Sequence, residues 1–214
     1  MQKIRQYLGR IDQGGERLLG LLNDLLDLSK LEAGKMAYHM APVHLGKLAR
    51  AVVTQFEGMA RAKGLALRVE GAEADPLAWC DEARIGQVLS NLLANAIQYS
   101  QPRGVISVRL GPGWLEEGEG KIAAVQVSVS DQGIGIPDAE LEQIFDKFVQ
   151  SSKTKSGSGG TGLGLSICRE IVRDHRGRIW AENRPEGGAR VSILLPCAPR
   201  HAMPQADQGM SAAA

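Results

Sequence analysis

The sequence has few cysteines, no long apolar run and almost no net charge, and each absence excludes a class of protein. No apolar stretch approaches the roughly 20 residues of a membrane span, and the N-terminus does not resemble a signal peptide. The 25 Lys and Arg residues nearly balance the 24 Asp and Glu residues, which argues against a nucleic-acid-binding protein. Cys80, Cys168 and Cys197 are too far apart to predict a disulfide framework or a metal site. We therefore expect a cytoplasmic segment that makes no membrane contact itself, although the full-length protein can be anchored upstream.

Residues 1–36 have the heptad pattern of a long helix in a helical bundle. The apolar positions of its two seven-residue series are Ile4, Ile11, Leu18 and Leu25, and Tyr7, Leu21 and Leu28. Gly14 interrupts the second series, and Gly34 is expected to cap the helix. A lone helix with such a stripe must bury it against a partner. We expect a homodimer through this helix, contact with a segment outside the chain, or both.

The remaining pattern predicts an α+β fold in which helices cover one face of a sheet, as a two-layer α/β sandwich. Helices are expected at 44–63, 81–99, 138–145 and 161–175, and strands at 65–70, 77–80, 105–110 and 123–131, followed by a hairpin of RIWAEN and ARVSILLP. The polar, glycine-rich GPGWLEEGEGK is expected to be a mobile loop. The predicted organisation is a helix over 1–36, a linker over 37–46, one domain over 47–196 and a disordered tail over 197–214.

The helical motif NLLANAIQYS contains two amides on one face. Asn91 and Asn95 are four residues apart, so they can present oxygens together to magnesium, a hard cation. Tyr99, one turn beyond, can close over a sugar or a phosphate. Taken alone, such asparagines are more often solvated or capping residues.

The motif DQGIGIP has an acid at the end of a predicted strand. Asp131 can accept a hydrogen bond from an exocyclic amine, and Gly133 and Gly135 let the backbone approach a flat base. Taken alone, the motif is equally typical of a simple turn after a strand.

The motif GGTGLGL, over residues 159–165, opens a predicted helix and leaves backbone N–H groups free for phosphate. It is not a P-loop, because no Gly-Lys-Ser/Thr follows. Taken alone, it is more typical of a glycine-rich linker.

In this order, and together with FDKFVQ at 145–150, these motifs resemble the ATP-binding domain of sensor histidine kinases. That domain belongs to a larger group with DNA gyrase, MutL and heat-shock chaperone ATPases, and the resemblance covers roughly residues 10–196. It implies a fold of that type, preceded by the second helix of a dimerisation and phosphotransfer hairpin.

The resemblance also implies ATP and Mg2+ as ligands. Asn95, with Asn91 beside it, would coordinate the metal, and Asp131 would bind the adenine amine. Phe145 and Phe148 would anchor a lid over the nucleotide. The implied ATP contacts are Asn91, Asn95, Gln98, Tyr99, Asp131, Gly133, Gly135, Ile136, Lys147, Phe148, Gly160, Thr161, Gly162, Leu163, Gly164 and Leu165.

Two departures from the family pattern stand out. Gln98 occupies a position where a phosphate-contacting Lys is common, so we hypothesise that Lys147, Lys153 or Lys155 contacts the γ-phosphate instead. The histidines of the chain are His39, His44, His175 and His201, and none of them has the sequence context of the family's phosphoacceptor. We expect the acceptor helix to precede residue 1, so that this chain is a fragment that binds ATP without autophosphorylating.

The implied function is transfer of the ATP γ-phosphate to a histidine, for relay to a response regulator. One alternative is a related ATPase, although the acid that would activate water is absent from residues 84–90 and Glu82 lies outside the motif. The other alternative is a non-catalytic, nucleotide-sensing dimerisation module.

Overall fold

The computed structural model describes residues 2–153 and 161–197, without the side chains of 2–6, 8–13, 16 and 17. Gly160, Lys155, His201 and the predicted tail from residue 198 therefore lie outside the described residues, as do the side chains of Ile4 and Ile11.

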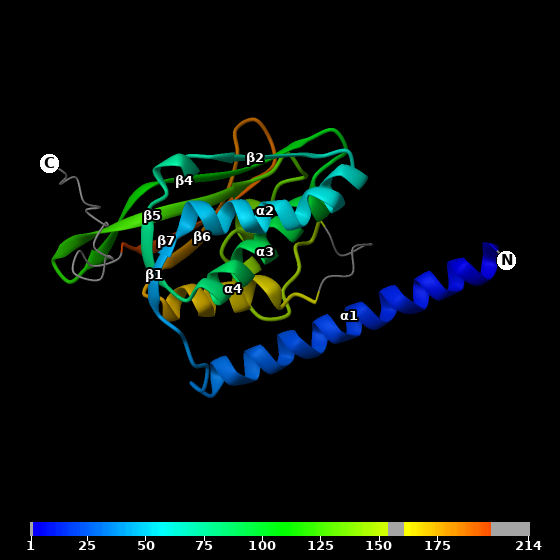
Figure 1. Ribbon diagram of the computed structural model, residues 1–214, viewed down its shortest axis with the longest axis horizontal. Helices are drawn as coiled ribbons and strands as arrows, with labels where there is room; N and C mark the ends of the chain where they lie inside the picture. The colour runs from blue at the N-terminus through cyan, green and yellow to red at the C-terminus, as the bar shows by residue number, and fades with distance from the viewer. Residues whose placement is uncertain (1, 154–160, 198–214) are drawn as a thin grey trace, which may run out of the picture.

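The chain begins with one long helix, α1 (Gln2–Glu32), which projects from the body of the molecule (Figure 1). Gly34 ends it as predicted. Its φ is +61°, its N–H bonds to the carbonyl of Leu31, and Lys35 N–H bonds to the carbonyl of Lys30, which is a Schellman cap. Leu28 and Leu31 are buried against the rest of the chain. The exposed apolar side chains of α1 are Tyr7, Leu18, Leu19, Leu21, Leu22, Leu25 and Leu26.

A mixed five-stranded sheet forms one layer of the body, with the strand order β2-β4-β5-β7-β6. The strands are β2 (Ala66–Glu70), β4 (Val105–Glu117), β5 (Gly120–Ser130), β6 (Arg178–Asn183) and β7 (Ala189–Pro196). Only the β2–β4 pair is parallel among these strands. Two further strands, β1 (Ala41–His44) and β3 (Leu77–Cys80), pair with each other, so part of the range predicted as a linker is a strand.

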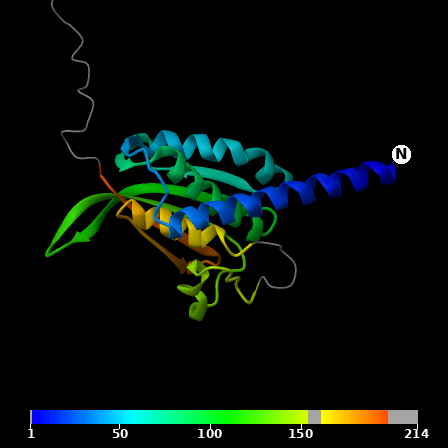
Figure 2. The ribbon, with the colours of Figure 1, turned by 90° about the horizontal axis from the view of Figure 1, so that it is seen from below.

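Three helices cover one face of the sheet and form the second layer (Figures 1 and 2). They are α2 (Leu45–Ala62), α3 (Glu82–Tyr99) and α4 (Gly164–Asp174). The alternation predicted for β5 holds, because Val125, Val127 and Val129 are buried in the core that these helices share with the sheet. The predicted α+β two-layer sandwich is confirmed.

Two predicted elements are wrong. Residues 111–121 are not a loop, because β4 and β5 continue as a hairpin to the register pair Glu117–Gly120. Leu115 pairs with Ile122 and packs with Leu194 of β7 in a small apolar cluster, which stabilises this arm despite its glycines. The single helix expected at 138–145 is instead two 3₁₀ turns, Asp138–Glu140 and Gln143–Phe145.

Candidate functional site

A cavity of about 280 Å³ lies between α3, the end of β5, the segment 134–151 and the start of α4. It brings together ten of the predicted ligand-binding residues, namely Asn91, Asn95, Tyr99, Asp131, Gly135, Ile136, Thr161, Gly162, Gly164 and Leu165. Apolar walls come from residues that were not predicted to contact a ligand, among them Leu92, Ala96, Val129, Ile134, Ile144, Val149, Ala189 and Val191. The result is a mostly apolar pocket with a few converging polar groups, which is the usual form of a small-molecule site.

Asp131, directly after β5, provides the carboxylate of this pocket. Its Oδ1 accepts hydrogen bonds from the N–H of Gly133 at 2.8 Å and of Ala189 at 3.2 Å. Among the described residues, both hydrogen bonds to this carboxylate use Oδ1. Oδ2 is therefore left to accept a hydrogen bond from a ligand. Burial raises the pKa of Asp131, although the two N–H groups and the charge of Arg184 act in the opposite direction.

Gly133 holds the loop after Asp131 against the end of α3. A Cβ at this position would lie 2.4 Å from the carbonyl oxygen of Tyr99, and Gly133 forms an isolated β-bridge with Ser100. Gly133 does not line the cavity itself. Its contribution is to let the chain approach α3 closely, which places Asp131 and Tyr99 on the same cavity.

The two amides of α3 occupy one wall of the cavity, as their spacing predicts. Asn91 directs Nδ2 to the carbonyl oxygen of Gly164 at 3.5 Å and to Sγ of Cys168 at 3.7 Å. Asn95 lies one turn further along the same wall. The amide of Asn91 thus faces the start of α4, where the second glycine motif ends.

The second glycine motif packs closely against the segment around Phe148. Gly162 has φ +72°, its carbonyl accepts a hydrogen bond from Phe148 N–H, and a Cβ there would lie 2.8 Å from the carbonyl carbon of Phe148. Thr161 Oγ1 accepts a bond from Leu163 N–H at 3.0 Å, and Leu163 is fully buried. Only a glycine permits this backbone approach, so Gly162 fixes the geometry of the cavity rim.

A residue of α1 also lines the cavity, and the motifs gave no sign of it. Asp24 accepts a hydrogen bond from Oγ1 of Thr161 at 3.3 Å. Burial and the neighbouring Asp27 raise the pKa of Asp24, while the hydroxyl of Thr161 lowers it. The helix that precedes the domain therefore contributes a carboxylate to the pocket.

Several predicted contacts lie outside the cavity lining. Gln98 is exposed, and its carbonyl oxygen accepts a bond from Nζ of Lys63 at 2.6 Å. Lys147 forms an ion pair with Glu32 of α1, and the side chain of Phe148 is 67% exposed. Phe145, by contrast, is buried.

The turn between β6 and β7 braces the first glycine motif, and sequence reasoning missed it. Asn183 accepts from Ile136 N–H at 2.9 Å and donates to the carbonyl of Ile136 at 2.6 Å. Arg184 Nη1 donates to the carbonyl of Asp131 at 2.8 Å, and a Cβ on Gly188 would lie 2.2 Å from that same oxygen. The Gly187-Gly188 pair is the only sequence signal of this turn. It indicates a tight turn but does not indicate that the turn packs against the first glycine motif.

The described histidines are engaged elsewhere. His175 is buried at the end of α4; its Nε2 accepts from Asp81 N–H at 3.0 Å, and its Nδ1 lies 2.7 Å from the carbonyl of Ile171. His44 pairs with Asp75 at 2.9 Å, and the backbone N–H of His39 donates to Asp81. None of the three lines the cavity.

Two features are absent from the described residues, 2–153 and 161–197. No group of three or more His, Cys, Asp or Glu side chains there is arranged to hold a metal ion. No helix in the same ranges combines the length and apolarity needed to cross a bilayer.

Comparison with known proteins agrees with this geometry. Residues 80–199 match the family described as histidine kinase-, DNA gyrase B- and HSP90-like ATPase. The chain is 37% identical over 204 residues to the circadian input-output histidine kinase CikA of Synechococcus elongatus, covering 91% of this chain and 25% of that protein. It is 32% identical over 182 residues to the sensor histidine kinase WalK of Bacillus subtilis, covering 85% and 29%. The chain thus spans less than a third of the length of either curated relative.

Solved structures show the same likeness. Full-length ShkA in complex with AMPPNP superposes with a TM-score of 0.73 at 28% identity, over 91% of this chain and 39% of that one. The catalytic domain of the histidine kinase ThkA superposes with a TM-score of 0.61 at 35% identity, over 74% of this chain and 96% of that domain.

Proposed function

Because the chain belongs to the family of histidine kinase-, DNA gyrase B- and HSP90-like ATPases and carries the catalytic ATP-binding domain of a sensor histidine kinase, we propose that it binds ATP with Mg2+ in the cavity described above. It transfers the γ-phosphate to a histidine outside this chain, for relay to a response regulator. The proposal includes a homodimer formed through α1, whose exposed leucines need a partner.

The observation that carries the proposal is the carboxylate of Asp131 at the end of an apolar cavity. Its Oδ1 is held by two backbone N–H groups, and Oδ2 faces no other partner in the described ranges. An exocyclic amine, such as that of adenine, supplies the missing donor. The apolar walls around Asp131, including Val129 and Ile134, suit the faces of a flat base.

The amide wall fits a hard cation bound to phosphates. Asn95 lines the cavity, and Asn91, whose Nδ2 is directed at Gly164, has an amide oxygen to offer as well. A magnesium ion with few protein ligands borrows oxygens from phosphate and water, so an amide pair suffices. When bound, the metal would offset part of the triphosphate charge.

The second glycine motif is the part of the cavity that suits phosphates. Gly162 and Gly164 line it, and α4 begins at Gly164, so the first N–H groups of that helix have no partner within the helix. It remains a prediction that Lys147, Lys153 or Lys155 contacts the γ-phosphate, and Lys155 lies outside the described residues. In this structure Lys153 Nζ bonds to the carbonyl of Ile134 at 3.0 Å, at the rim of the cavity, whereas Lys147 is engaged with Glu32.

The chain's own residues would act by holding and orienting the nucleotide. Asp131 fixes the base, the amides of α3 fix the metal and phosphates, and the apolar walls exclude water from the bound base. Such positioning and electrostatic stabilisation supply most of the catalysis in phosphoryl transfer. The attacking group in this proposal is the imidazole of an acceptor histidine outside this chain, since none of the three described histidines lines the cavity.

The ATPase alternative has less support. Glu82 opens α3, thirteen residues before Asn95, which corresponds to about 20 Å along the helix. Glu82 also does not line the cavity. Steady-state ATP hydrolysis that Glu82→Ala abolishes would restore this alternative.

Calorimetric titration of ATP tests the binding site. Asp131→Ala should weaken ATP binding by about 1–3 kcal/mol with or without magnesium, because it removes a hydrogen bond to the base. Asn95→Ala should instead reduce the difference between titrations with and without magnesium. Unchanged affinity in both variants would contradict the proposed site.

Incubation with γ-labelled ATP tests the transfer. The 214-residue chain should acquire no acid-labile phosphate, whereas a matching helix that carries a phosphoacceptor histidine should acquire it when supplied with the chain. Labelling of the chain itself on histidine would contradict the first expectation. Intact ATP binding without transfer to any acceptor would favour the non-catalytic sensing module.

A further inference from the structure

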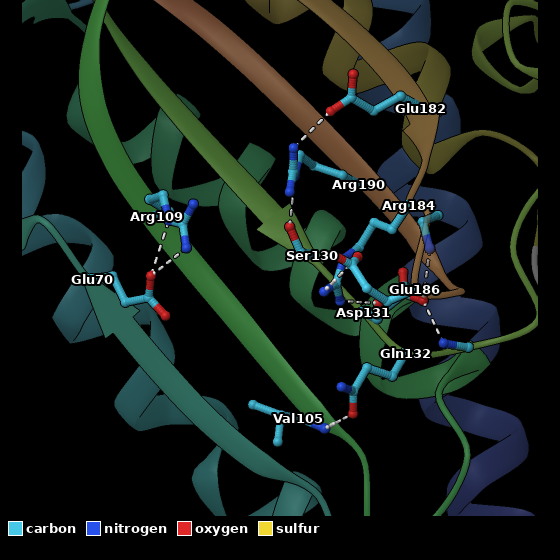
Figure 3. A network of polar contacts seen from close by, with 12 residues as sticks. Glu70, Val105, Arg109, Ser130, Asp131, Gln132, Glu182, Arg184, Glu186 and Arg190 are labelled. Carbon is cyan, nitrogen blue, oxygen red and sulfur yellow. Dashed lines mark hydrogen bonds and ion pairs between the residues drawn. The ribbon is translucent and has the colours of Figure 1, made fainter.

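The β6–β7 turn and the first residue of β7 hold Asp131 through three hydrogen bonds, of which Figure 3 shows the one from Arg184. Arg184 Nη1 donates to the carbonyl of Asp131 at 2.8 Å. Ala189 and Asp131 exchange two hydrogen bonds, from Asp131 N–H to the Ala189 carbonyl at 2.9 Å and from Ala189 N–H to Oδ1 at 3.2 Å. Arg184 N–H in turn bonds to the carbonyl of Gly188, which closes the turn itself. The guanidinium is therefore held on Asp131, the residue that directly follows β5.

Arg184 is placed as an electrostatic partner as well as a hydrogen-bond donor. Burial raises the pKa of the Asp131 carboxyl, and the positive charge of Arg184 counteracts that effect. The other titratable or charged groups around this loop are Tyr99 on α3, Lys153 at the cavity rim, Asp138 bonded to Asn183, and Glu186 beside Arg184. Arg190 is turned away, toward Ser130 and Glu182 on the open face of the sheet (Figure 3).

The charge of Arg184 is not neutralised by its own ion pair. Glu186 lies 3.4 Å from Nη2, but its side chain is 71% exposed, whereas that of Arg184 is 18% exposed. Water screens an exposed carboxylate strongly, so such pairs contribute little. Nε of Arg184 is buried and has no hydrogen-bond partner among the described residues. The guanidinium is thus mostly shielded from solvent and its charge acts on Asp131.

We propose that Arg184 is a positioning residue for Asp131: its guanidinium fixes the main chain at the end of β5 and supplies the positive charge that keeps the carboxylate able to accept a hydrogen bond from adenine. This inference rests on the proposed function, because it assumes that Asp131 binds the base. It adds a residue of the β6–β7 turn to a site otherwise built from the Asn-rich helix and the two glycine motifs.

The two parts of this role have different signatures. Loss of the hydrogen bond to the Asp131 carbonyl weakens nucleotide binding by the same factor at every pH. Loss of the charge raises the pKa of Asp131, and ATP affinity falls as the pH drops through that pKa because the carboxyl becomes protonated. In a plot of ATP affinity against pH, we call the fall in affinity at low pH the acid limb. Removal of the charge therefore moves the acid limb to higher pH, whereas loss of a purely structural contact leaves it in place.

The experiment compares Arg184→Gln with Arg184→Lys by titrating ATP between pH 4.5 and 8. Gln retains a donor for the Asp131 carbonyl without the charge, and Lys retains the charge. We expect the acid limb of Arg184→Gln to lie at higher pH than that of the wild type, because the positive charge that lowers the pKa of Asp131 is lost. The acid limb of Arg184→Lys should coincide with the wild type.

Arg109→Met is the matched control, because Arg109 also forms an ion pair with a glutamate, Glu70, but at a distance from the cavity (Figure 3). It should leave the acid limb unchanged. A second readout needs no nucleotide: the carboxyl carbon of Asp131, followed by NMR, should titrate at higher pH in Arg184→Gln than in the wild type.

The outcomes separate the two claims. If the wild type binds no ATP but Asp131 still titrates higher in Arg184→Gln, the proposed function fails and the electrostatic role of Arg184 stands. If the wild type binds ATP and Arg184→Gln gives a parallel profile with an unshifted Asp131 resonance, the inference is overturned and the proposed function stands. An equal shift in Arg109→Met also overturns it.

Discussion

Oγ1 of Thr161 donates a hydrogen bond across 3.3 Å to Oδ2 of Asp24, and this contact joins α1 to the rim of the cavity. The two neighbouring carboxylates of α1 are paired with cations of the domain, Asp27 with Arg84 and Glu32 with Lys147. Among the described residues Asp24 has only this neutral hydroxyl as its hydrogen-bond partner. It therefore brings an uncompensated negative charge to the end of the pocket that we assign to phosphates.

This charge predicts that Asp24→Asn binds ATP more tightly than the wild type. We expect a gain of about threefold to tenfold in the absence of magnesium, since a carboxylate near a triphosphate repels it. Adenosine, which has no phosphates, should bind both proteins equally. Because burial raises the pKa of Asp24, the difference should vanish as the pH falls through that pKa. Asp27→Asn removes the same charge outside the cavity lining and serves as the control, and an equal gain there would contradict the prediction.

Gly188→Ala should disrupt the adenine end of the site. A Cβ at Gly188 would lie 2.2 Å from the carbonyl oxygen of Asp131 and 2.8 Å from Cα of Gln132, so the chain after β5 must shift. Gly187→Ala is the matched control, because Gly187 also has positive φ, +93°, but an added Cβ meets nothing within 4 Å. Gly187→Ala should cost about 1 kcal/mol of unfolding free energy from backbone strain alone. Gly188→Ala should cost more and also lose ATP affinity, as urea unfolding and calorimetry would show; equal effects would argue against the close packing.

We predict that Asp81 makes a pH-dependent contribution to the free energy of unfolding. It caps α3 by accepting Arg84 N–H at 3.0 Å, and it accepts His39 N–H at 2.7 Å. Burial acts to raise the pKa of Asp81, but these backbone hydrogen bonds outweigh it and the pKa lies below its ordinary value of 3.8. The stabilisation is therefore fully present above that value and is lost as the pH falls through the lower, native pKa. Asp81→Ala should cost about 1–2 kcal/mol at pH 7, less near pH 3, and Glu82→Ala, at an exposed position, should cost less at both.

Cys168 should be inert to alkylation in the folded protein. It is fully buried beneath Asn91, and burial raises the pKa of its thiol to about 12. Alkylating reagents attack the thiolate, which is scarce at pH 8 under these conditions. Mass spectrometry of the native chain should find Cys197, which is only half-buried, modified before Cys168. Rapid modification of Cys168 without unfolding would contradict the packing of α4 on α3.

The elements that the sequence predicted well are those with strong local signals. The alternation of Val125, Val127 and Val129 identified β5, and Gly34 marked the end of α1 because a Schellman cap needs a residue with positive φ. The β4–β5 arm had no such signal. Gly111, Pro112 and Gly113 resemble a loop, and the residue of β7 that packs against Leu115 and helps to bury it is Leu194, far along the chain.

The site shows the same division. Asn91, Asn95 and Asp131 stand in short motifs whose spacing indicates a ligand, and the structure places all three on one cavity. Asp24 and Arg184 have no motif. Asp24 contacts Thr161, 137 residues away in the sequence, and Arg184 contacts Asp131, 53 residues away. Pairings over such separations depend on the whole fold, so pattern alone could not reveal them.

The length of α1 means that a small change in its tilt at Gly34 displaces its other residues by several ångströms. The helix has 31 residues and projects from the body of the molecule (Figure 2); among its described side chains, the buried ones, Leu28 and Leu31, lie near its C-terminal end. A swing of about 10° at Gly34 displaces Asp24 by about 2–3 Å and the far end of the helix by about 8 Å, given a rise of about 1.5 Å per residue. The smaller displacement is enough to break the hydrogen bond between Thr161 and Asp24, so a modest tilt of α1 would separate the helix from the cavity rim at this contact.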